Sequence, residues 1–197
     1  MNASSAGIAA GIGGGTNGKA CDVELRGGTV TARAGSYEGD YGAAPQAVGC
    51  GEVPEASGAV ALELGLRVYA SETVESPVAF EAREKACRGE WAQIEPCRFH
   101  ACQGGICRWC GCGVAVVREG DALQVICRLP GQKKVRLILA RFDDGGRFRS
   151  CRVVETETGV FEDSFDVSGG AGRYRAFVTD REGRPLWEPG EETSGKQ

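Results

Sequence analysis

The stretch VRLILARFDDGGRFRSCRVV, residues 135–154, decides the fold class. Residues 134–142 are apolar on both faces around Leu137 to Ala140, which is typical of a central strand in a sheet. DDGG follows at 143–146, and an Asp-Gly pair between strands tolerates the left-handed backbone of a hairpin turn. The stretch therefore predicts that residues 134–142 and 147–154 pair as antiparallel strands.

Further strand signals surround this hairpin. DALQVICRL, GVFEDSFDV and RYRAFVTD alternate apolar and polar residues, and Gly or Ser turns bound them. Short strands at this spacing predict a small antiparallel, immunoglobulin-like β-sandwich over residues 114–189. The polar residues 190–197 are expected to form a disordered tail.

The first part of the chain is rich in glycine and contains a repeat. CDVELRGGTVTARAG at 21–35 is echoed by GAVALELGLRVYASE at 58–72. Each copy holds two short pieces of strand-like alternation separated by glycine, as the corners of a coil require. The matched residues are Val23 with Val60, Leu25 with Leu62, Val30 with Val68 and Ala32 with Ala70.

This repeat predicts that residues 1–72 form the end of a parallel β-solenoid. A flexible Gly-rich linker is the alternative, but a linker does not need the β-branched and aliphatic alternation of DVEL or LRVYA. Two coils bury little surface, since such coils normally stack three or more deep. The solenoid is therefore expected to be truncated, and the fold class is expected to be all-β throughout.

Both halves of the chain resemble parts of bacterial extracellular proteins. AGIGGG followed by GGTVTA, within residues 7–72, resembles the Gly-rich repeats of large cell-surface or secreted proteins, often labelled carbohydrate-binding or adhesin-like. VRLILARFDDGGRFRSCRVV with RYRAFVTDREGRPL resembles the small β-sandwich that links modules in such proteins. The resemblance implies an extracellular fragment with a scaffolding or ligand-presenting role, a glycan or other cell-surface ligand as partner, and no catalysis.

Residues 73–113 are expected to connect the two β domains. FEAREKAC predicts a short helix over residues 80–87, which Gly89 ends. WAQIEP then predicts a brief strand that stops at Pro96, because proline lacks the backbone donor that a sheet needs.

The connector concentrates metal-ligating side chains. Cys97 and His100 are spaced C-x2-H, and Cys107 and Cys110 are spaced C-x2-C. Two such pairs suit one tetrahedral zinc ion, because thiolate and imidazole match its preference and leave no position open for a catalytic water. The site is therefore interpreted as a structural, zinc-knuckle-like staple. The glycines expected to supply positive φ for its turns are Gly104, Gly105 and Gly111.

An iron–sulfur cluster is an alternative use of the same region. Cys102, Cys107 and Cys110 have the C-x4-C-x2-C spacing of a plant-type ferredoxin loop. Cys127 or Cys151 would supply the fourth ligand. This interpretation would make the chain an intracellular metal-binding or electron-transfer protein.

Other interpretations of the cysteines remain open at this stage. The chain has 10 cysteines, an even number that permits disulfides in a secreted protein. Cys97 with His100 would be a nucleophilic pair, although the sequence shows no group to orient it. Cys102 or Cys112 would each be able to replace a zinc ligand. The cysteines interpreted as small core hydrophobes are Cys21, Cys50, Cys127 and Cys151.

Charge and hydropathy limit the remaining function classes. The formal net charge is -4, without the basic patch that nucleic-acid binding requires. No apolar run approaches the ~20 residues that a membrane span needs. No oligomer is expected, and no catalytic constellation is evident, so the chain is interpreted as a non-enzyme. The opening MNASSAGIAAGIGGGTNG lacks the charged and apolar regions of a secretory signal, which by itself indicates the cytoplasm. Its Gly-rich sequence resembles the middle of a repeat, however, so the chain is interpreted as a fragment of a longer protein.

Overall fold

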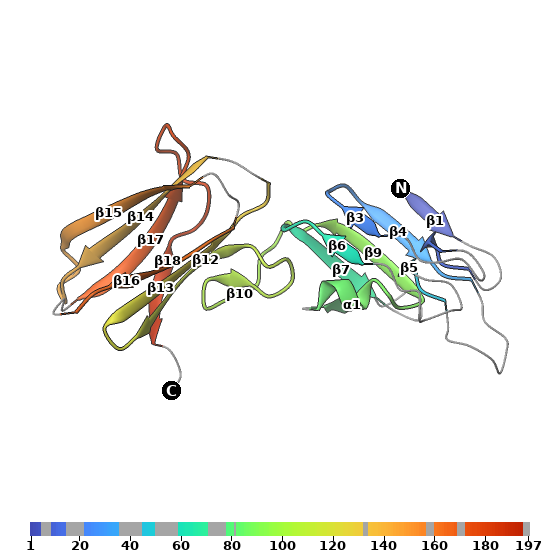
Figure 1. Ribbon diagram of the computed structural model, residues 1–197, viewed down its shortest axis with the longest axis horizontal. Coiled ribbons are helices and arrows are strands. Elements are labelled where there is room, and N and C mark those ends of the chain that lie inside the picture. Colours follow the sequence, from blue (N-terminus) through green and yellow to red (C-terminus); the bar gives the residue numbers. More distant parts are fainter. Residues whose placement is uncertain are drawn as a thin grey trace. The chain divides into compact units, whose positions relative to one another are not determined.

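The structure, a computed structural model, describes residues 1–4, 9–14, 22–35, 45–49, 59–70, 78–80, 82–131, 134–156, 160–168 and 172–194. The chain divides into two compact units, Met1–His100 and Ala101–Gln197. Strands make up most of both units, and the described residues contain one short helix (Figure 1). The predicted all-β class is therefore confirmed.

A mixed five-stranded sheet forms the centre of the first unit. In spatial order its strands are β1 (Asn2–Ser4), β4 (Val30–Arg33), β9 (Trp91–Pro96), β7 (Leu66–Ala70) and β8 (Val78–Phe80). β1 and β4 are parallel, whereas β9 pairs antiparallel with both of its neighbours. Val68 and Ile94 are almost completely buried in the core of this unit.

Two short parallel pairs contribute to the same core. They are β2 (Ile12–Gly13) with β5 (Val48–Gly49), and β3 (Val23–Leu25) with β6 (Val60–Leu62). Val23 lies opposite Val60, so the register expected from the repeat is confirmed. Gly13 has φ +129°, and a Cβ there would lie 2.0 Å from the Gly49 carbonyl oxygen. Only glycine allows the two backbones to approach so closely.

The expected stack of coils is interrupted by β9. Val30 and Val68 are aligned by the repeat, but each pairs with Ile94 instead of with the other. The reason is that Ala92 and Ile94 alternate onto the core side, so the strand fills the space between β4 and β7. Residues 91–96, expected in a separate connector, therefore belong to the first unit.

The helix α1 spans Arg83–Ala86 and is shorter than the expected 80–87. The start of that range belongs to β8 instead. The buried Arg83 side chain donates hydrogen bonds from Nη1 to the carbonyl oxygens of Glu63 at 3.0 Å and Leu66 at 2.8 Å. These bonds hold the helix against the start of β7.

The second unit is a β-sandwich in which one continuous order of hydrogen-bonded strands supplies both layers. In spatial order these are β15 (Phe148–Thr156), β14 (Val135–Phe142), β17 (Arg173–Thr179), β18 (Gly190–Ser194), β12 (Gly113–Glu119), β13 (Ala122–Arg128) and β16 (Val160–Asp166). A small hairpin of β10 (Cys102–Gln103) and β11 (Ile106–Cys107) joins the start of β12. The predicted hairpin is β14–β15.

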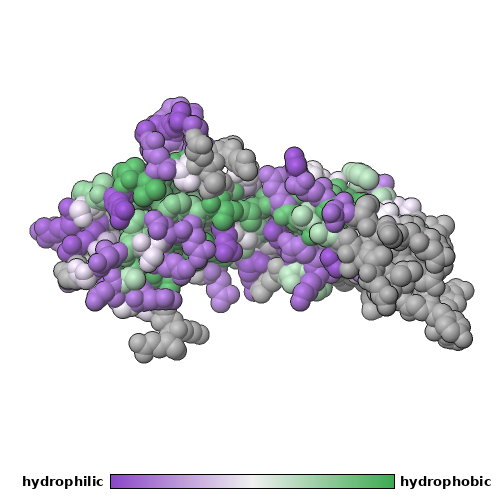
Figure 2. Space-filling view, viewed as in Figure 1, coloured by the Kyte–Doolittle hydropathy of each residue, from purple (hydrophilic) through white to green (hydrophobic). Residues whose placement is uncertain are grey.

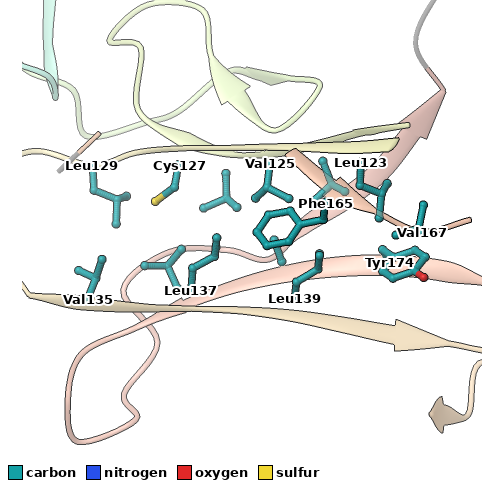
Figure 3. Packing of buried hydrophobic residues seen from close by; sticks show 14 residues of the cluster. Leu123, Val125, Cys127, Leu129, Val135, Leu137, Leu139, Phe165, Val167 and Tyr174 are labelled. Atoms are coloured by element: carbon teal, nitrogen blue, oxygen red, sulfur yellow. The ribbon is translucent and has the colours of Figure 1, made fainter. Parts of the chain in front are cut away.

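The core of the sandwich lies between its two layers (Figure 3). Alternate residues of β13 and β14 point into it, as the period-2 patterns of both strands require. Burial of each such aliphatic side chain stabilises the fold by about 1.5–3 kcal/mol. In the close-up the residues facing one another are Leu123, Val125, Cys127 and Leu129 on one side and Val135, Leu137, Leu139 and Tyr174 on the other.

Residues 190–194 are not a disordered tail. They form β18, which pairs parallel with β12 and antiparallel with β17. A polar sequence is ordered here because neighbouring strands on both sides bind its backbone, and because Arg118 forms a 2.6 Å ion pair with Glu192. The sandwich is therefore antiparallel except at this one pair among its described strands.

The turn of the predicted hairpin, at Asp143–Arg147, recurs at Asp180–Arg184. The Asp143 amide donates to the Arg147 carbonyl at 3.0 Å, and the Arg147 amide donates to Asp143 Oδ1 at 2.8 Å. Asp180 and Arg184 repeat both bonds at the same lengths. Gly146 has φ +76°, which explains why glycine follows the acidic residues.

Candidate metal centre

The hairpin β10–β11 turns through two glycines. Gly104 has φ +60° and Gly105 has φ +86°, the combination of a type I′ turn. Gln103 lies opposite Ile106, and Cys102 lies opposite Cys107. The predicted positive φ of both glycines is therefore confirmed. The turn also determines the position of Cys107 on β11.

The hairpin is held close to β12 by glycine contacts. The Val114 amide donates to the Gly105 carbonyl at 3.1 Å. A Cβ on Gly105 would lie 2.1 Å from the Val114 carbonyl oxygen, and one on Gly113 would lie 2.0 Å from the Gly105 carbonyl oxygen. Neither distance is compatible with a side chain, so these two glycines determine the approach of the hairpin.

A second turn carries the C-x2-C pair. The Gly111 amide donates to the Cys107 carbonyl at 2.8 Å, and the Cys107 amide donates to the Cys112 carbonyl at 2.7 Å. Gly111 has φ +73°, as predicted. The turn encloses Cys107 and Cys110, whose exposed fractions are 1% and 0%.

The C-x2-H pair follows the end of β9. The Cys97 amide donates to the Gly65 carbonyl at 2.7 Å, which extends the pairing of β9 and β7 by one residue. The Cys97 thiol lies 3.3 Å from the Phe99 carbonyl oxygen. Cys97 is nearly buried and His100 is exposed.

The four predicted ligands come together. One ligand atom from each of Cys97, His100, Cys107 and Cys110 lies within 4.8 Å of the other three. Zinc bonds of about 2.3 Å to sulfur and about 2.0 Å to nitrogen place tetrahedral ligand atoms roughly 3.5–3.8 Å apart. The four side chains therefore need only small shifts to surround an ion, and the cluster could hold a metal.

The structure does not assemble the ferredoxin-like set. Cys127 lies in the sandwich core, and Cys151 is exposed on β15. The expectation of a core position for Cys151 is wrong, because the next residue, Arg152, lies opposite the core residue Leu139, so Cys151 faces the other side of the sheet, where it is exposed. Cys127 is buried as expected. Cys21 and Cys50 lie outside the described residues.

Neither suggested replacement ligand belongs to the group. Cys112 is buried but is not among the four clustered residues. Cys102 is exposed opposite Cys107. Partial burial raises the pKa of the Cys102 thiol, and the nearby Cys107, Glu188 and Cys110 raise it further. No disulfide joins any of the eight cysteines that the structure describes.

Comparison with known proteins adds no relative to this picture. No family model, curated protein or solved structure matches the chain. Within the described parts of the chain, no helix has the length and apolar character needed to cross a membrane. The Cys/His cluster is therefore the feature of the described residues that bears most directly on function.

Proposed function

We propose that residues 97–110 bind one structural zinc ion and that the chain is a non-catalytic, all-β binding or scaffolding module. The observation that carries this proposal is the convergence of Cys97, His100, Cys107 and Cys110 within 4.8 Å. Three thiolates and one imidazole complete a tetrahedral zinc shell. Such a shell leaves no position for a reacting water, which favours a structural role.

The donor set supports zinc over other common ions. Calcium and magnesium take oxygen ligands, whereas soft thiolates select zinc, copper(I) or iron–sulfur clusters. The ferredoxin-type set would take its fourth ligand from Cys127 or Cys151, but Cys127 lies among apolar neighbours in the sandwich core and Cys151 is exposed on β15. His100 instead completes a Cys3His set.

Zinc would stabilise a region with little apolar core of its own. The short strands β10 and β11 and the turn at Gly111 are joined by few backbone hydrogen bonds. Cys107 and Cys110 are buried, and thiolates there are stable only when a cation compensates their charge. The free energy of metal binding therefore contributes to the folding of this segment.

The wider role that we propose is a module of a bacterial surface or secreted protein, with a glycan or other cell-surface ligand. The support is the Gly-rich parallel pairing of β2 with β5 and of β3 with β6, together with a β-sandwich in the same chain. Glycan-array profiling of the full chain tests the ligand. Binding to a defined glycan class is the expected result, and uniform absence of binding would leave only the scaffolding role.

Metal analysis tests the zinc site. Protein purified anaerobically should contain about one zinc per chain, measured by plasma mass spectrometry. Cys107→Ser should remove the metal, whereas Cys102→Ser, which changes the exposed residue opposite Cys107, should retain it. Cobalt substitution should give the intense visible bands of tetrahedral thiolate coordination.

Two other results would replace the zinc assignment. Iron with labile sulfide would establish a cluster of the ferredoxin type and favour the intracellular electron-transfer function. Absence of metal, with Cys97 joined to Cys107 or Cys110 in non-reducing peptide maps, would establish disulfides instead.

A further inference from the structure

The sandwich of the second unit has an open seam. β15 and β16 are the two ends of its strand order, and each pairs with one neighbour among the described strands, β14 and β13 respectively. The sheets are open and do not close into a barrel. The outer edges of β15 and β16 therefore present backbone groups that another strand can pair with.

The two edge strands lie beside each other at the seam. The Arg152 guanidinium of β15 sits over the Phe165 ring of β16 at 4.8 Å. Val154 and Phe161, also from these two strands, pack against the same core. From β15 to β16 the strand order contains five antiparallel pairs and one parallel pair. β15 and β16 therefore run antiparallel to each other.

Each edge carries one charge on its inward face. Arg152 lies opposite the buried Leu139, and Asp163 lies opposite the buried Val125, so both charged residues share the faces of core residues. Inward charges on edge strands prevent pairing with apolar or like-charged strands. Here their signs are opposite, so the edge of β15 matches the edge of β16.

We propose that a second copy of this chain is the partner of the seam. β15 of each copy pairs antiparallel with β16 of the other, and Arg152 lies opposite the partner's Asp163. A two-fold axis parallel to the strands relates the two copies. The pairing of β15 with β16 therefore forms twice, once from each copy. Such a dimer is closed and isologous, which excludes further growth into fibres.

One register agrees with the facing of every paired residue. With Arg152 opposite the partner's Asp163, residues 150–154 pair with residues 161–165, beyond the bulge at Arg149. Val154 then meets the partner's Phe161 on the inward side. Arg149 is the bulged residue of β15, because Ser150 and Phe148 are the register partners of Arg141 and Phe142, and it already contacts Asp143 at 2.6 Å. The Arg152 pair therefore carries most of the specificity.

Exposed apolar residues on β15 favour a covered edge. Val153, within the paired segment, has an exposed fraction of 53%, and Phe148, just before that segment, has one of 58%. Hydrophobic residues lie among hydrophilic ones on the face of this unit seen in Figure 2. In the proposed interface, backbone hydrogen bonds supply the affinity and the charges supply the register.

Sedimentation of the full chain under reducing conditions tests the proposal. Wild type should show a concentration-dependent monomer–dimer equilibrium. Arg152→Asp and Asp163→Arg should each weaken dimerisation by about tenfold or more, and the double exchange should restore it to within about threefold. Arg175→Glu alters an exposed pair on another strand and should leave the equilibrium unchanged.

A cross-link tests the register. Cys151 should lie opposite the partner's Ser164 on the outward faces, whereas within one copy these residues belong to different layers. Ser164→Cys should therefore give a disulfide-linked dimer under mild oxidation, and Cys151→Ser should abolish it. Ser168→Cys, beyond the paired segment, should not cross-link. A wild type that stays monomeric, or a dimer insensitive to the charge exchanges, would overturn the proposal.

Discussion

Arg118 Nε donates to Glu192 Oε1 over 2.6 Å, and this contact joins residues 74 positions apart. Glu192 Oε2 accepts a further hydrogen bond of 2.8 Å from the Tyr174 amide. Exposed fractions of 25% for the Arg118 side chain and 16% for Glu192 show that the ion pair is partly shielded from water. One carboxylate therefore connects β12, β17 and β18.

Glu192→Ala should destabilise the second unit by about 1–3 kcal/mol, because it leaves two shielded donors without their acceptor. Glu191→Ala is the matched control, since the neighbouring Glu191 forms an exposed pair with Arg175 and should cost less than about 0.5 kcal/mol. Urea unfolding measures both variants. Equal effects would show that the Arg118 contact has no special weight.

A fragment of residues 101–197 should unfold cooperatively, because the sandwich core is built from residues within it. Circular dichroism and calorimetry detect the transition. A fragment of residues 101–189 lacks β18 and should lose that transition, since β12 and β17 are then left without the strand between them. A cooperative transition in the shorter fragment would contradict the role assigned to β18.

Gly105→Ala should weaken zinc binding more than Gly104→Ala. Both glycines have positive φ, but a Cβ on Gly105 meets the Val114 carbonyl at 2.1 Å, whereas a Cβ on Gly104 meets nothing within 4 Å. The first change must displace the hairpin that carries Cys107, and the second costs only the backbone strain of about 1–2 kcal/mol. Competition with a chromophoric chelator gives the two affinities. Similar affinities would mean that the metal site tolerates movement of the hairpin.

Alkaline pH should destabilise the second unit between about pH 9 and pH 11. Burial raises the pKa of the Cys127 thiol to about 11, whereas the unfolded chain loses this proton near its ordinary value of 9.0. The folded state therefore holds a proton that the unfolded state releases, and stability falls as the pH rises through this window. Urea unfolding of the isolated 101–197 fragment at several pH values measures the slope, and Cys127→Ala should reduce it. An unchanged slope would assign the effect to another group.

Local sequence patterns predicted which residues form strands better than they predicted which strands pair. The Asp-Gly turn before Gly146 and the alternation of β13 and β14 specify hairpins, because both features act over a few residues. The repeat likewise predicted the register of Val23 on Val60. It could not show that β9 separates Val30 from Val68, since the alternation of Ile94 suits any apolar space between two strand edges.

The candidate site was predictable because its ligands are close in sequence. The C-x2-H and C-x2-C spacings confine the four side chains to one short stretch, and the glycines indicate where it turns. The exposure of Cys151 was not predictable, because alternation on β15 does not show which face meets the core. The structural role of Glu192 was not predicted, because the polar composition of β18 is also that of a disordered tail. Only its pairing with β12 and β17 distinguishes the two.

The position of β18 between β12 and β17 affects the order in which the second unit folds. A ribosome releases β12 and β13 long before residues 190–194 emerge, so the early strands must wait for a strand synthesised much later. Pairing over such a distance is slow because a long loop has to close first. During that interval the edges of β12 and β17 are open to other chains, and chaperone binding in the cell should concentrate on them.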